Sequence, residues 1–203
     1  HGRNPLQSGC NSEQSNGNGS LMRIAPLVFY VQNMGWQKRF EAVRKCSSIT
    51  HAHIRSIIGC WYLVEYLRRL MKGDDKYQAC SNLQPMPESR ASIFELPVEE
   101  IKPYRRLLTR GFDKIPEESI QSSGYVVHTL EAAMWCFLTT DSYRAAVLKA
   151  VNLGGDTDTT GCVTGALAGL YYGEEAIPKE WLSVLARRED IETLAERAPK
   201  VVE

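Results

Sequence analysis

The sequence has no excess of charge of either sign, no closely paired cysteines and no long hydrophobic run. It carries 24 basic and 24 acidic residues, which argues against a nucleic-acid or anionic-membrane partner because such surfaces need a basic face. None of its 6 cysteines stands in a C-x-x-C pair, which disfavours a zinc ribbon or a thioredoxin-like redox motif. No apolar run approaches the roughly 20 residues that cross a bilayer, and the first 20 residues lack the apolar segment of a signal peptide. We therefore expect a cytoplasmic chain with reduced thiols.

Strand patterns are nearly missing as well, and helical periodicity takes their place. Residues 54–73 place apolar side chains at the 3.6-residue spacing of one helix face. Further helices are expected over residues 21–34, 36–48, 125–140 and 141–153, after the aspartates and threonines at 156–160, and over 178–197. Ser20 and Asp141 precede two of these segments and are predicted N-caps. Because no heptad pattern persists, the sequence predicts an all-α, compact orthogonal bundle in a single domain spanning residues 1–203.

Two aspartates and three threonines stand together at 156–160, directly after a pair of glycines. In an extended segment, residues two apart point the same way, so Asp156 and Asp158 are expected to aim at one point, with Thr159 adding an oxygen. Such hard ligands suit Mg²⁺, Mn²⁺ or Ca²⁺. Capping of the following helix is the other interpretation, but one residue would be enough for that. A calcium EF-hand is disfavoured because its twelfth position is Leu167 and not Glu.

Four segments resemble the ADP-ribosylglycohydrolase family in their order and spacing. They are SNGNGSLMRIAPL at 15–27, SSITHAH at 47–53, SSGYVVHTLEAAMWCF at 122–137 and NLGGDTDTTGCVTGALAG at 152–169. The resemblance implies an all-α fold with two Mg²⁺ or Mn²⁺ ions, and an enzyme that cleaves the glycosidic bond between ADP-ribose and a modified acceptor. The partner it implies is an ADP-ribose-containing substrate, such as an ADP-ribosylated protein.

The resemblance also assigns roles to individual residues. Asp156, Asp158 and Thr159 match one half of the metal site. Ser15, Asn16, Gly17 and Asn18 match the loop around the diphosphate and distal ribose, His51 matches a ligand-contacting histidine, and Tyr125 and Val126 match the adenosine side of the cleft. Glycine and small side chains before a helix start suit phosphate binding by backbone N–H groups.

The other half of the family's metal site is missing from the sequence. The family has a Thr-Asp-Asp-Thr motif and further acidic residues, whereas the Asp74-Asp75 pair lacks threonine and is expected to form a solvated turn. Glu131 lies inside a predicted helix and is expected to be structural, so no catalytic residue is predicted within this chain. The chain is expected to be an N-terminally truncated domain, the C-terminal two-thirds of the fold. A non-catalytic ADP-ribose- or nucleotide-binding protein is the alternative.

Overall fold

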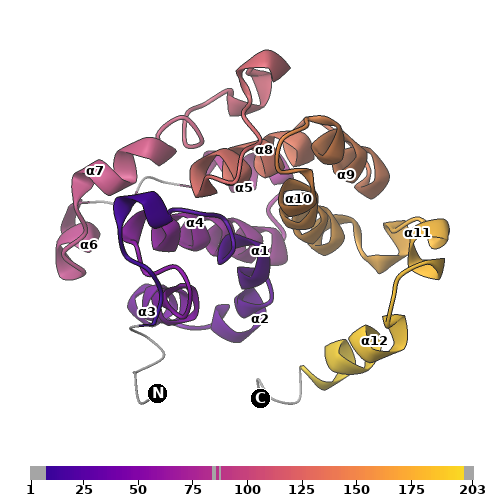
Figure 1. Cartoon of the computed structure of the whole chain (residues 1–203), viewed down its shortest axis with the longest axis horizontal. Helices are drawn as coiled ribbons and strands as arrows, with labels where there is room; N and C mark the ends of the chain where they lie inside the picture. Colours follow the sequence, from indigo (N-terminus) through magenta and orange to yellow (C-terminus); the bar gives the residue numbers. More distant parts are fainter. Residues whose placement is uncertain (1–7, 84–85, 87, 199–203) are drawn as a thin grey trace.

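Helix α4 (Ile54–Met71) lies in the middle of the fold, where apolar residues on nearly all of its sides are buried. In the computed structural model, which describes residues 8–83, 86 and 88–198, this helix packs against α1, α2, α3, α5, α7, α8 and α10. Figure 1 shows α1, α2 and α3 on one side of α4 and α8, α9 and α10 on the other. The core is therefore built around a helix with little solvent-facing surface, whereas the sequence predicted a single apolar face.

The other α-helices range from 4 residues in α1 to 16 in α10. They are α1 (Leu21–Ile24), α2 (Leu27–Val31), α3 (Trp36–Ser48), α5 (Lys76–Ser81), α6 (Glu88–Ile93), α7 (Val98–Ile101), α8 (Val126–Leu138), α9 (Tyr143–Asn152), α10 (Thr157–Tyr172), α11 (Lys179–Ser183) and α12 (Arg188–Arg197). The described residues form no strand, only two isolated bridges. The prediction of an all-α fold is confirmed. Residues 1–7 lie outside the described part.

Two predicted helices are each divided in the structure. The helix expected over residues 21–34 splits into α1 and α2 at Pro26, which has no N–H to continue the hydrogen-bond ladder. The helix expected over 178–197 splits into α11 and α12 at Arg187, whose φ of 57° is left-handed. At both positions the helix is interrupted, although the helical pattern of apolar residues continues on the C-terminal side.

The two predicted N-caps also differ from the structure. Ser142, and not Asp141, caps α9, because its Oγ accepts a hydrogen bond from the N–H of Ala145 at 3.1 Å. Ser20 occupies the N-cap position of α1, but its side chain makes no capping bond; its Oγ accepts from Ser47 Oγ at 3.0 Å. Ser20 therefore ties α1 to the end of α3.

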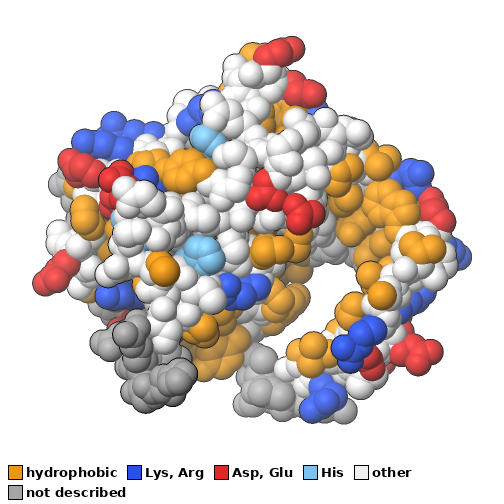
Figure 2. Space-filling model, in the orientation of Figure 1, with side chains coloured by type: hydrophobic (Ala, Val, Ile, Leu, Met, Phe, Trp, Pro, Cys, Tyr) orange, Lys and Arg blue, Asp and Glu red, His pale blue; other side chains and the backbone are white. Residues whose placement is uncertain are grey.

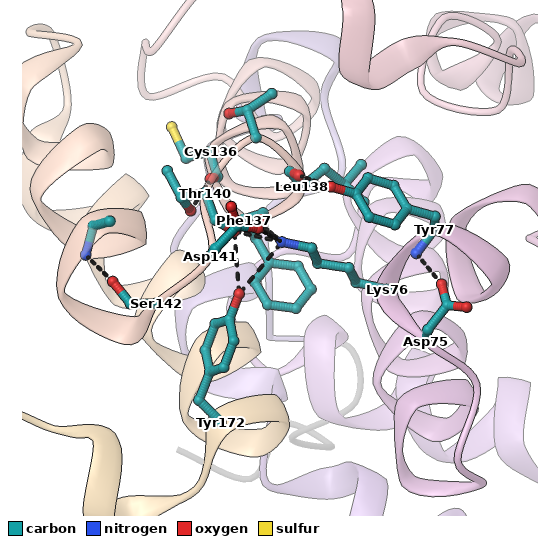
Figure 3. Close-up of polar contacts among 12 residues, drawn as sticks. Asp75, Lys76, Tyr77, Cys136, Phe137, Leu138, Thr140, Asp141, Ser142 and Tyr172 are labelled. Atoms are coloured by element: carbon teal, nitrogen blue, oxygen red, sulfur yellow. Dashed lines mark hydrogen bonds and ion pairs between the residues drawn. The ribbon is translucent and has the colours of Figure 1, made fainter.

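Lys76 of α5 binds the C-terminal ends of α8 and α10 (Figure 3). Its buried ammonium donates to the carbonyl oxygens of Phe137, at 3.4 Å, and Thr140, and to the hydroxyl of Tyr172 at 3.3 Å. It also lies 3.2 Å from a carboxylate oxygen of Asp141. A cation is favourable at a helix C-terminus, where carbonyl groups lack helical partners. One side chain thus joins the C-terminal ends of two helices.

The C-terminal helix α12 extends away from the helical body. All its residues are at least partly accessible, and Val184, Leu185, Ile191 and Leu194 expose apolar side chains on and before it. Figure 2 shows an open space between this arm and the rest of the molecule. No helix in the described residues is long and apolar enough to cross a membrane.

Candidate functional site

The loop at residues 15–20 meets the start of α10 through Asn18. The side-chain amide of Asn18 donates to Asp156 Oδ2 at 2.7 Å and to Thr129 Oγ1 of α8 at 2.8 Å. The backbone N–H of Asn18 donates to the carbonyl of Gly124 at 3.1 Å. Asn18 is only 8% exposed, so these bonds are sheltered from water. The asparagine thus holds the loop, α8 and the aspartate cluster together.

Asn16 fixes the same loop to the starts of α4 and α8. Its side-chain oxygen accepts from Ser56 Oγ at 3.0 Å, and its backbone carbonyl accepts from the N–H of Val126 at 3.0 Å. The side chain of Val126 is fully buried in the core. Asn16 and Val126, both predicted to bind ligand, therefore support the shape of the loop. Ser15, Gly17 and Gly19 are half-buried, and they are the loop residues with accessible surface.

His51 lies against the glycines of the loop. A Cβ atom added at Gly19 would lie 2.8 Å from Cε1 of His51, so this close approach requires glycine. The ring Nδ1 is hydrogen-bonded with Thr50 Oγ1 at 2.8 Å. Burial, with a smaller effect from the Arg23 guanidinium, lowers the pKa of His51 below 6.5, so the imidazole is neutral at pH 7. The structure thus places His51 beside the loop.

Tyr125 lies directly before α8 and contacts the loop through its backbone. Its backbone forms an isolated antiparallel bridge with Gly17. Its hydroxyl accepts a hydrogen bond from Arg55 Nη1 at 3.3 Å, and its ring meets the ring of His128 edge to face, 4.9 Å between centroids. The half-buried phenol is therefore held in place while part of its surface stays accessible.

The aspartate cluster is helical, and the expectation of an extended segment is wrong. Helix α10 begins at Thr157, so Asp158 and Thr159 belong to its first turn, and Asp156 occupies the N-cap position without making a side-chain cap bond. A tight turn precedes it: Gly155 has φ of 68°, and the N–H of Asp156 donates to Ser122 O at 2.8 Å. The carboxylate of Asp156 is thereby left free to face Asn18.

The three predicted metal ligands are adjacent. The hydrogen bond from Asn18 holds the pKa of the Asp156 carboxyl below its usual value, and contacts with Thr159 and Asp158 act in the same direction. Asp156 is therefore ionised at neutral pH, and Asp158 is exposed beside it. Two carboxylates and a hydroxyl are donors that a hard divalent cation prefers. No group of three or more His, Cys, Asp and Glu side chains suited to a metal occurs among the described residues, so this set fits only part of a cation site.

Three acidic residues outside the candidate site, Glu131, Asp74 and Asp75, form hydrogen bonds or ion pairs within the fold. Glu131 is 3% exposed and pairs with the Arg106 guanidinium, which agrees with its predicted structural role. Asp75 accepts from the N–H groups that follow it and caps α5, while Asp74 pairs with Arg69 at 3.3 Å. These residues lie in the turn that the sequence predicted.

Sequence reasoning missed Arg55, which contacts Tyr125, and its partner Glu100. Arg55 Nε donates to Glu100 Oε2 at 2.8 Å, and no motif pointed to either residue. A cavity of about 510 Å³ lies elsewhere, between α5 and residues 108–114. None of the predicted site residues lines it. The candidate site is thus defined by side-chain chemistry and not by the size of a cavity.

The chain also matches a known protein family and proteins with assigned names. The profile of the family described as ADP-ribosylglycohydrolase matches residues 1–203. The ADP-ribosylarginine hydrolase Tri1 of Serratia proteamaculans is 35% identical over 89% of this chain and 46% of its own length. The ADP-ribosyl-[dinitrogen reductase] glycohydrolase of Rhodospirillum rubrum is 31% identical over 86% of this chain and 52% of its own.

A solved structure is also similar. It is described as an ADP-ribosylglycohydrolase-related protein complex, with a TM-score of 0.78 and 34% identity over 95% of this chain and 63% of that one. The chain spans about half the length of the curated relatives it matches. On the sequence match and the shared fold, the chain belongs to the ADP-ribosylglycohydrolase family.

Proposed function

We propose that this chain forms part of a hydrolase that cleaves the glycosidic bond between ADP-ribose and a modified acceptor. The observation that carries the proposal is the hydrogen bond from Asn18 to Asp156. It brings the loop predicted to surround the diphosphate against the residues predicted to bind metal. The names of the relatives, an ADP-ribosylarginine hydrolase and an ADP-ribosyl-[dinitrogen reductase] glycohydrolase, support an ADP-ribosylated protein as the substrate.

In this proposal each segment has a distinct task. The partly accessible Ser15 and Gly17 bind phosphate oxygens, the serine through its side chain because its backbone N–H donates to Ser12 O at 2.9 Å. His51 donates or accepts a hydrogen bond as a neutral imidazole. Tyr125 offers a flat surface to the adenosine. Asp156 and Asp158 face the distal ribose as carboxylates, and Asn18 keeps Asp156 both oriented and ionised. Binding energy from the phosphates and adenosine thus fixes the ribose where the carboxylates lie.

The residues Asp156, Asp158 and Thr159 would hold Mg²⁺ or Mn²⁺. The chemistry that such ions supply when bound is to polarise an oxygen and to lower the pKa of a water molecule. Because these residues make up only part of a ligand set, we expect the 203-residue chain to bind the metal weakly and to hydrolyse substrate slowly. The binuclear centre of the complete site is part of the proposal.

Calorimetric titration with Mn²⁺ tests the metal site. The chain should bind weakly, and Asp158→Ala should remove the binding. Asp141→Asn is the matched control, because its carboxylate is 96% exposed and lies near the opposite ends of α8 and α10. Tight two-site binding would contradict the expected weak affinity, and binding that Asp158→Ala leaves unchanged would refute the metal assignment.

Release of ADP-ribose from an ADP-ribosylarginine-bearing protein tests the activity. With Mn²⁺ in excess, slow release above background should be abolished by Asp156→Asn. The incomplete ligand set favours one second candidate, a protein that binds ADP-ribose without cleaving it. That candidate predicts ADP-ribose binding with no release at any Mn²⁺ concentration.

A further inference from the structure

Arg55, in the first turn of α4, joins three segments around the candidate site. Its guanidinium donates to both oxygens of Glu100 on α7, at 2.8 and 3.2 Å, and to the Tyr125 hydroxyl at 3.3 Å. It also lies 3.6 Å from a carboxylate oxygen of Glu13, at the start of the loop. The Arg55 and Glu100 side chains are each only 15% exposed. Arg55 is therefore a sheltered link between α7, α8 and the loop.

The Arg55–Glu100 pair is fixed in orientation. A planar guanidinium that donates two parallel hydrogen bonds to one carboxylate cannot rotate without breaking them. His53 Nδ1 lies 3.8 Å from the same carboxylate. The backbone of Arg55 is anchored too, because its carbonyl accepts from the Tyr104 hydroxyl at 2.7 Å. The N–H group directed at Tyr125 thus comes from a rigid base.

The hydrogen bond from Arg55 restricts rotation of the Tyr125 side chain. Tyr125 is the residue before α8, so no helical turn fixes its side chain, and its ring is bounded on one side by the edge-to-face contact with His128. The Arg55 guanidinium, with its carbon 6.0 Å from the ring centroid, bounds it again. The ring also packs against the hydrophobic core. Without Arg55, the hydroxyl would bond to water and the ring would lose the contact that holds its hydroxyl end.

We propose that Arg55, held by Glu100, is a positioning residue that sets the orientation of the Tyr125 ring for the adenosine part of the ligand. The inference rests on the proposed function, since it gives Arg55 a role in the same site. A flat surface ordered in advance lowers the entropy cost of binding. Loss of that order should weaken ADP-ribose binding about 3- to 10-fold, in line with the cost of immobilising one side chain.

A double-mutant cycle on ADP-ribose affinity tests the inference. Arg55→Met and Tyr125→Phe should each weaken ADP-ribose binding about 3- to 10-fold. Because both substitutions remove the same contact, the double variant should have the same affinity as the single variant that binds less tightly. Arg55→Lys should not restore affinity, since an ammonium cannot pair with Glu100 and Tyr125 in the same fork. Tyr125→Phe keeps the test valid if Arg55→Met fails to fold.

Arg39→Met is the matched control. Arg39 makes the same kind of two-point pair with Glu65, at 2.7 and 3.0 Å, between α3 and α4. Its removal should lower thermal stability without changing ADP-ribose affinity. An additive double variant, or wild-type affinity in both single variants while the wild type binds, would overturn the role of Arg55 and leave the proposed function intact. A wild-type chain that does not bind ADP-ribose would overturn both.

Discussion

Replacement of Gly155 by alanine should be among the most damaging single-methyl changes in this protein. Gly155 has φ of 68°, a region that costs an L-residue roughly 1–2 kcal/mol. A Cβ there would also overlap the carbonyl oxygen of Ser122. That oxygen accepts the hydrogen bond from the Asp156 N–H at 2.8 Å, so the clash displaces a partner worth about 1 kcal/mol net. The smaller entropy of the unfolded alanine chain reduces the conformational cost to about 1 kcal/mol. With overpacking of about 1–3 kcal/mol, the total loss should be about 3–5 kcal/mol.

Gly154→Ala provides the comparison that isolates the clash. Gly154 has φ of 79°, and no atom lies within 4 Å of its would-be Cβ. The free energy of unfolding of Gly154→Ala should therefore fall only by the conformational cost. That cost is about 1 kcal/mol once the smaller entropy of the unfolded alanine chain is counted. The free energy of unfolding of both variants can be measured by urea denaturation followed by far-UV circular dichroism.

The difference between the two variants is the informative quantity. We expect Gly155→Ala to lie about 2–4 kcal/mol below Gly154→Ala. Equal losses at the two positions would show that backbone conformation alone accounts for the effect. In that case the close contact between the 154–155 turn and Ser122 would not constrain the start of α10, and the reasoning would be wrong.

Three other predictions concern groups outside the predicted ligand set. Lys76→Met should cost about 2–4 kcal/mol in urea unfolding, because the carbonyls at the end of α8 lose a buried cation; Asp141→Asn, at an exposed carboxylate, should change stability by less than about 0.5 kcal/mol. Burial lowers the pKa of His128 below 6.5, so its protonation favours the unfolded chain, and stability should fall as the pH drops below about 6.5; His128→Gln should reduce the fall in Tm between pH 7 and pH 5. Glu131→Gln, which weakens the buried pair with Arg106, should cost about 1–3 kcal/mol while ADP-ribose affinity, measured by calorimetry, stays unchanged.

The longer helices could be predicted from the sequence because burial leaves a periodic trace. Helices α3, α4, α8 and α9 follow their apolar patterns closely. The errors occur where one residue overrides the pattern, as at Pro26, or where two neighbouring residues are both of a type that favours N-caps, as at Asp141 and Ser142. Whether Asp158 belongs to a turn or to a helix depends on where α10 begins, and helix starts are not fixed by periodicity.

The site was harder to predict because its contacts connect distant parts of the chain. Asn18 and Asp156 are 138 positions apart, and only the resemblance to a family placed both in one site. The geometry then gave Asn18 a partner that residue types alone could not supply. Arg55 illustrates the same difficulty: an arginine in the first turn of a helix is ordinary in sequence, and its link to Tyr125 depends on how α4, α7 and α8 pack.

The contact between Lys76 and the ends of α8 and α10 has a consequence for engineering. With 13 residues, α8 is about 20 Å long, so this lysine holds the distal end of the scaffold whose opposite end carries Tyr125 and the aspartates. If α8 tilts as a rigid helix about the end that Lys76 holds, a small change in its angle displaces the opposite end, which carries Tyr125. Mutant libraries designed to tune the spacing between Tyr125 and Asp156 should therefore sample the neighbours of Lys76 as well as the residues of the site.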